Sequence, residues 1–245
     1  MTEAPATFRP PAEGSGLSLP ARVLGILTSP RETFADVVAR PRWFGMMALV
    51  ILVSAVCTGG FLMTEVGQQA YLDNQLEATA RFTGEVSEAQ EAGMRQMLPY
   101  AAPITVVSMA VFMPLMWAVI AGILFAVFSA ALGGTSTFKQ VFAVVVHSSA
   151  VSIVQQLFVT PLNYVRESMS SATNLAVFLP MLDESSFLAR LLGTIDLFLI
   201  WWIVLLAIGL GVLFKRKTGP IATGLFIVYG VIAVIVAAFF GRGGA

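Results

Sequence analysis

Long stretches without a charged residue constrain this chain more than any other feature of its sequence. Asp, Glu, Lys and Arg are missing from residues 43–63, 96–138, 140–165 and 218–241, and residues 191–214 contain one of them, Asp196. A helix of about 20 apolar residues crosses the roughly 30 Å of hydrocarbon in a bilayer. Because 57% of the residues are hydrophobic and only 11% are charged, the chain cannot cover these stretches with polar surface. The sequence therefore predicts an all-α, polytopic membrane protein.

Helix-end signals divide these stretches into a bundle of five transmembrane helices within residues 43–240. Gly133 and Gly134 end the second helix, and Thr137 with Gln140 forms a capping box that opens the third. Pro114 is expected to kink the second helix. The predicted spans cover about residues 43–64, 102–132, 138–161, 192–214 and 221–240.

The residues before the first span predict a tail and two interfacial helices. Residues 1–16 are rich in proline and glycine and should be disordered. Residues 17–42 carry apolar side chains at near-helical spacing, which predicts amphipathic helices that lie on the membrane surface. Ser29 is expected to cap the second helix, with Pro30 at its first position and Glu32 completing a capping box.

Two segments between the spans are predicted to lie outside the hydrocarbon. Residues 65–100 carry acidic side chains that are spread rather than clustered, so they predict a polar helical hairpin, broken near Gly84, and not a cation site. Residues 162–192 are expected to form an interfacial segment. Basic residues concentrate before the first span and at 215–217, which predicts a cytoplasmic N-terminus, with the hairpin and the C-terminus outside.

Charge and motif content exclude several classes of function. The 14 basic and 14 acidic residues cancel, so no overall field attracts nucleic acid. The single cysteine, Cys57, cannot form an intramolecular disulfide. The sequence has no HExxH zinc motif, no GxSxG nucleophile elbow and no second intramembrane aspartate. We therefore expect neither an enzyme nor a bound cofactor or metal.

Polar residues within the predicted spans form a candidate functional site. Asp196 is the acidic residue of the fourth span, and the third span carries a polar stripe that includes Gln156, Thr160 and Asn163. These three share the depth of Asp196, so we expect them to hydrogen-bond it. The contact would be either a helix-packing anchor or part of an ion or proton pathway. His147 should point away from the stripe and bond to a neighbouring helix.

Short polar motifs carry a family resemblance. LTSPRETF at residues 27–34 precedes PRW at 41–43, and IDLFLIWW follows at 195–202. Together with FKQV at 138–141, they resemble the Yip family of polytopic membrane proteins, named for interacting with Ypt/Rab GTPases, in its bacterial form. The resemblance covers about residues 17–240 and implies five spans and a scaffold that organises membrane or recruits partners. The chain lacks the Asp-Leu-Tyr-Gly-Pro motif of eukaryotic members, so Rab binding is not implied.

A non-enzymatic membrane scaffold is the function that these observations favour. Its expected docking surface is cytoplasmic and is formed by Pro30, Phe34 and Val38. The expected partners are the lipid bilayer and either another protein or a second copy of the chain. Short loops and spans rich in Ala, Val and Gly suit a bacterial cytoplasmic membrane. The alternative is a small-solute or ion transporter that uses the polar site around Asp196.

Overall fold

The computed structural model of the protein describes residues 16–131, 133–179, 181–183 and 186–239, and these residues are helical apart from short connections. This confirms the all-α prediction and the polytopic membrane bundle. The tail predicted over residues 1–16 lies outside the described residues, except for Gly16.

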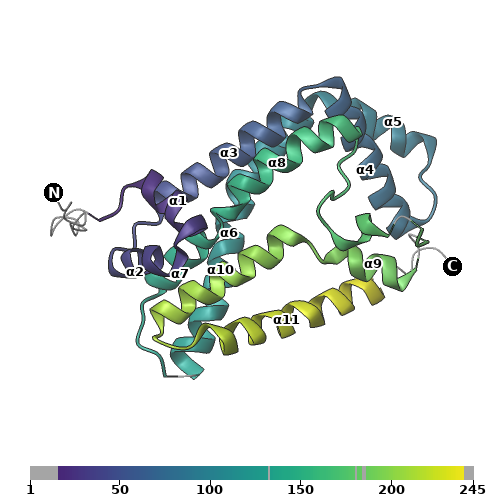
Figure 1. Ribbon diagram of the computed structural model, residues 1–245. Helices are drawn as coiled ribbons and strands as arrows, with labels where there is room; N and C mark the ends of the chain where they lie inside the picture. The colour runs from purple at the N-terminus through teal and green to yellow at the C-terminus, as the bar shows by residue number, and fades with distance from the viewer. Residues whose placement is uncertain (1–15, 132, 180, 184–185, 240–245) are drawn as a thin grey trace, which may run out of the picture.

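One group of the bundle is built from three long helices that run side by side (Figure 1). They are α3 (Phe44–Leu62), α6 (Ala101–Phe125) and α8 (Val151–Arg166). α3 packs along both α6 and α8. α6 continues into a π-helical segment, η2 (Ala126–Ala131), and α8 follows α7 (Phe138–Ser148) after a short break.

The other group is formed by α10 (Leu197–Leu213) and α11 (Thr218–Phe239), and α9 (Phe187–Thr194) packs on α11. The two groups join at one end, where α1 (Leu19–Thr28) and α2 (Pro30–Ala39) lie beside α7. There α2 packs on both α7 and α10. We call this the α1–α2 end of the bundle.

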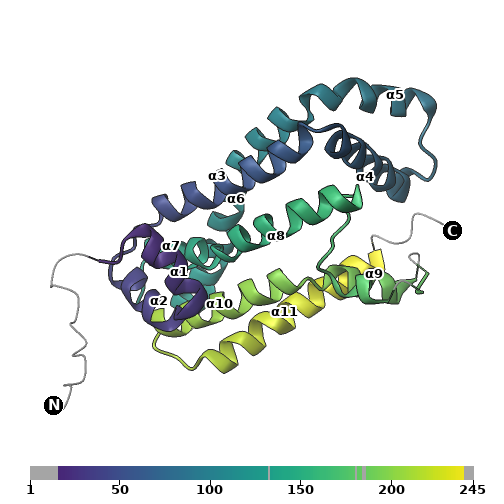
Figure 2. The ribbon, with the colours of Figure 1, turned by 45° about the horizontal axis from the view of Figure 1, so that its top comes forward.

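The predicted hairpin over residues 65–100 lies at the opposite end of the first group (Figure 2). It consists of α4 (Glu65–Thr83), α5 (Glu88–Met97) and the short η1 (Leu98–Tyr100). Gly84 breaks it as expected, with a φ of +84° that favours glycine. A further short helix, η3 (Leu175–Phe178), follows α8.

Four described segments are long and apolar enough to cross a membrane: Phe44–Leu62, Glu88–Ser129, Phe138–Arg166 and Thr218–Ala238. The helix predicted over 192–214 begins at Leu197 instead, because the chain breaks between α9 and α10. α10 has 17 residues, which corresponds to about 26 Å at about 1.5 Å per residue. The count of five spans therefore stays a prediction.

The capping signals have mixed outcomes. The Thr137–Gln140 capping box opens α7 as predicted. The box predicted at Ser29 and Glu32 is wrong, because the Ser29 side chain makes no capping hydrogen bond. Ser29 both ends α1 and begins α2, and its carbonyl accepts from the Thr33 hydroxyl at 3.0 Å. Pro30 occupies the first turn of α2 as expected.

The main core extends into the N-terminal helices and includes the apolar side of α2. The position of these helices at the membrane surface stays a prediction. Phe34 and Val37 are fully buried in the same cluster as Val144 of α7 and Leu206 of α10. The apolar side of an amphipathic helix is stable only when it is buried, and the apolar side of α2 is buried against α7 and α10. The close approach is possible because α10 carries Gly209 opposite Phe34.

Gly209→Ala should destabilise the bundle. A Cβ on Gly209 would lie 2.6 Å from Val144 Cγ1 and 2.9 Å from Phe34 Cε1. Overpacking a core of this kind costs about 1–3 kcal/mol, so the thermal unfolding midpoint of the purified protein in detergent should fall. Gly230→Ala in α11 is the matched control, because a Cβ there meets nothing within 4 Å. Equal midpoints for the two variants would contradict the packing described.

Candidate functional site

A buried arginine forms the polar centre of the α1–α2 end. Arg22 of α1 is only 2% exposed. Its Nε and Nη2 lie 3.0 Å and 2.7 Å from Oδ2 of Asp36 in α2. Its guanidinium also donates to the carbonyl oxygens of Arg40, at 3.1 Å, and Arg42, at 3.3 Å. A charge this deeply buried is stable only when it is paired and hydrogen-bonded, and Arg22 meets both conditions.

His147 of α7 completes the cluster from the opposite side. Its Nε2 lies 3.5 Å from Nη1 of Arg22, and its Nδ1 lies 2.7 Å from the carbonyl oxygen of Ala143. A guanidinium can only donate, so Nε2 accepts and Nδ1 carries the hydrogen that is donated to Ala143. His147 bonds to another helix, α1, as the sequence predicted, although its arginine partner was not foreseen.

These contacts fix the two N-terminal helices to the membrane bundle. Arg22 joins α1 to α2, to the chain at residues 40–42 and to α7. Gln140 adds a second link, because its Nε2 donates to the carbonyl of Val38 at 3.2 Å. We call Arg22, Asp36 and His147 the ionic cluster.

The ionic cluster could have been partly recognised from the sequence. Arg22 is the sole charged residue between 17 and 30, and it lies at helical spacing from Leu19 and Ile26, on the side that becomes buried. A lone charge on the apolar side of a helix signals a buried partner. Nothing in the sequence singles out Asp36 or His147 as that partner.

The structure corrects the predicted docking surface. Phe34 is fully buried, Val38 is half-buried with its carbonyl bound by Gln140, and Pro30 is half-buried. Phe34 therefore cannot meet a partner. The exposed side of α2 carries different residues, Arg31, Glu32, Ala35 and Ala39.

Asp196 has partners other than those predicted. It is the N-cap of α10, and its Oδ1 accepts from the backbone N–H groups of Phe198 and Leu199 at 2.8 Å and 3.2 Å. Its Oδ2 accepts from the hydroxyls of Thr173 and of Ser171, the latter at 3.2 Å. The carboxylate thus holds the segment after α8 against the start of α10.

The polar stripe on α8 does not reach Asp196. Thr160 Oγ1 donates to Gln156 Oε1 at 3.4 Å on the same helix, and Asn163 Oδ1 is buried without a hydrogen-bond partner. None of the hydrogen bonds to Asp196 comes from these three residues. The break before α10 is the reason, because it places Asp196 beside residues 171–174, where Asn174 and Asp196 form an isolated antiparallel bridge.

The residues described offer no metal centre: they contain no group of three or more His, Cys, Asp or Glu side chains close enough to hold an ion. The two polar clusters satisfy buried charge and hydrogen-bonding groups and so position helices. The long apolar helices and the buried clusters at their ends define a polytopic helical membrane protein.

A comparison with protein families identifies the family. A family model, the Yip1 domain, matches residues 24–240, and the chain belongs to this family. This confirms the resemblance carried by the short polar motifs. Neither the curated proteins nor the solved structures contain a match to the chain.

Breaking the ionic cluster on one side should cost far more stability than breaking an exposed ion pair. Arg22→Met removes the buried partner of Asp36 and His147 and leaves Asp36 with only the longer ion pair to Arg40, at 3.5 Å. Loss of one member of a fully buried pair costs about 3–5 kcal/mol, and Asp36 is 17% exposed, so we expect a cost toward the lower end of this range. Arg95→Met is the matched control, because Arg95 pairs with Glu91 on an exposed surface, where such pairs contribute about 0–1 kcal/mol. Thermal unfolding midpoints in detergent measure the loss of stability in the two variants. Similar midpoints would show that the cluster does not fix the helices.

Asp196→Ala should loosen the junction before α10. Loss of an N-cap costs about 0.5–2 kcal/mol, and the variant also releases the hydroxyls of Ser171 and Thr173. Limited proteolysis should therefore cleave the segment between α8 and α9 faster than in the wild type. Asp73→Ala serves as the control, because Asp73 lies exposed in α4 and accepts from Gln69. Cleavage at the wild-type rate in Asp196→Ala would show that Asp196 does not hold the segment after α8 against α10.

Proposed function

We propose that the protein is a non-enzymatic membrane scaffold that binds a protein partner through the exposed face of α2, formed by Arg31, Glu32, Ala35 and Ala39. The observation that supports it is the ionic cluster. By fixing α1 and α2 to α7, the cluster turns an N-terminal extension into a rigid surface. A rigid surface binds with a smaller loss of conformational entropy than a mobile segment.

The residues of this face suit a polar protein contact. Arg31 and Glu32 provide charges of both signs, and Ala35 and Ala39 leave room for a neighbouring chain to approach. Their spacing places them on the side of α2 opposite to Thr33, Phe34 and Val37, which are buried. A partner can therefore bind without disturbing the core.

The distribution of basic residues supports a cytoplasmic position for this face. Lys215, Arg216 and Lys217 connect α10 to α11 near the α1–α2 end, as Figure 1 shows. Short basic connections are retained in the cytoplasm. We accordingly place α1 and α2 in the cytoplasm, and α4 and α5 outside, of a bacterial inner membrane.

Membership of the Yip1 domain family supports the non-enzymatic part of the proposal, because the family consists of non-enzymatic membrane proteins. The transporter alternative required a polar pathway from Asp196 to Gln156, Thr160 and Asn163. Both carboxylate oxygens of Asp196 are instead hydrogen-bonded elsewhere. One caps α10, and the other accepts from the segment after α8. No observation favours a pathway there.

A photoreactive amino acid at position 35 should capture the partner in intact cells. Ala35 is exposed, so its adduct should migrate as the protein joined to a second polypeptide, identified by mass spectrometry. Position 34 is the matched control, because Phe34 is fully buried and should give only adducts within the chain, to α7 or α10.

Charge reversal provides the specificity test. Arg31→Glu removes the positive charge from the exposed face of α2 without touching the core, so it should abolish the position-35 adduct while leaving the thermal midpoint unchanged. Position 35 giving no protein adduct, or one that survives Arg31→Glu, would argue against this docking face.

A further inference from the structure

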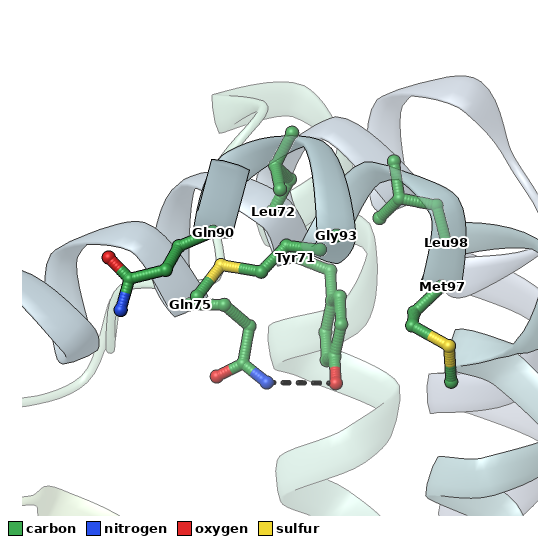
Figure 3. Close-up of a pocket in the computed structure, with 8 residues that line it drawn as sticks. Tyr71, Leu72, Gln75, Gln90, Gly93, Met97 and Leu98 are labelled. Carbon is green, nitrogen blue, oxygen red and sulfur yellow. Dashed lines mark hydrogen bonds between the residues drawn. The ribbon is translucent and has the colours of Figure 1, made fainter. Parts of the chain in front are cut away.

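The hairpin at the far end of the first group contains a pocket of about 400 Å³ between α4 and α5. It is lined mainly by apolar side chains, with Leu72, Met94, Met97 and Leu98 among them. Its size lies within the range of small-molecule sites in proteins. Figure 3 shows Tyr71 and Gln75 of α4 in this pocket together with Met97 and Leu98.

α5 presents two different faces. Gln90, Gly93, Met94 and Met97 follow helical spacing and line the pocket. Glu91 and Arg95 form an ion pair, with 2.7 Å between Arg95 Nη2 and Glu91 Oε1, and lie on the other side of the helix. The charged face suits water, and the face toward α4 borders apolar space that no side chain of the described hairpin fills.

The pocket is continuous with the membrane-facing surface of α6. Met97 lines both this pocket and an adjoining open hollow formed with Tyr100, Pro103, Ile104 and Val107. Ile104 and Val107 begin a row of exposed apolar side chains on α6, which suits contact with lipid. The helical segment Glu88–Ser129 has 42 residues, so it extends well beyond the hydrocarbon, and α5 forms the part that leaves it.

We propose that this pocket binds one acyl chain of a bilayer phospholipid, which enters from the α6 surface past Met97. An acyl chain matches an apolar lining that opens toward the hydrocarbon, and methionine side chains adapt to a flexible chain. Two of the polar side chains in the lining, Tyr71 and Gln75, bond to each other. Gln75 Nε2 donates to the Tyr71 hydroxyl at 2.9 Å, and a phenol that accepts keeps its own hydrogen to donate.

Photolabelling with a lipid tests the proposal. The full chain is reconstituted into phosphatidylcholine vesicles that contain a trace of phosphatidylcholine with a diazirine at the end of one acyl chain, and adducts are mapped by mass spectrometry. Adducts per residue over 71–75 and 90–98 should exceed those over residues 111–116 of α6 by at least threefold. Equal labelling of the two regions, which is the pattern of ordinary surrounding lipid, would overturn it.

Two glycine substitutions provide a matched pair. Gly93 lines the pocket and Gly122 lies in α6, and a Cβ at either position meets nothing within 4 Å. Gly93→Trp should fill the pocket and reduce hairpin adducts at least fivefold, while Gly122→Trp leaves them unchanged. Thermal midpoints near the wild-type value show that both variants are folded. Hairpin labelling that persists in Gly93→Trp would overturn the proposal.

A third variant keeps the test informative if Gly93→Trp does not fold. Met94→Gln with Met97→Gln retains the size of the side chains but makes the lining polar, so it should also lower hairpin labelling. A photoreactive amino acid at position 94 distinguishes a lipid in the pocket from a second copy of the chain. It should give a lipid adduct, and a dimer adduct in its place would assign the pocket to a second copy of the chain.

Discussion

The buried guanidinium of Arg22 is the interaction on which the arrangement of the bundle depends. It binds a carboxylate, two backbone carbonyls and an imidazole that come from three parts of the chain, α2, residues 40–42 and α7. Removing an arginine from water is costly, and only a complete set of partners compensates for it. The α1–α2 pair is therefore held in one position, and α2 contributes one side of the core, where it packs against α7 and α10.

The opposite end of the second group is organised by a separate set of polar contacts. Asp196 caps α10 and holds the segment after α8, while two bonds tie α9 to α11. The Tyr229 hydroxyl donates to the carbonyl of Thr194, and Arg190 Nε donates to that of Ala237 at 3.0 Å. Within lipid, apolar surfaces alone do little to select one neighbour over another, so polar contacts and close-packing glycines specify the pairing.

The sequence predicted the features that follow from composition and local signals. The apolar stretches, the capping box at Thr137 and the break at Gly84 each depend on residues close together in the chain, and each is present in the structure. Apart from the capping box predicted at Ser29 and Glu32, the errors concern contacts between distant segments. The apolar residues around Phe34 have the spacing of an amphipathic helix. The burial of Phe34 depends on Val144 and Gly209, and helical periodicity cannot reveal contacts with such distant residues. The apolar residues on both sides of Asp196 predict that it lies inside a helix. In the structure the helix is interrupted between α9 and α10, where Asp196 bonds to the distant Ser171 and Thr173.

The packing of Phe34 on Gly209 also sets an order of assembly. α2 is synthesised first, yet the glycine that receives its aromatic ring follows roughly 170 residues later, a long separation for a core contact. Until α10 has been inserted, the ring of Phe34 lacks part of its final environment. Helices α1 and α2 are thus made well before α10, the helix that completes their native environment.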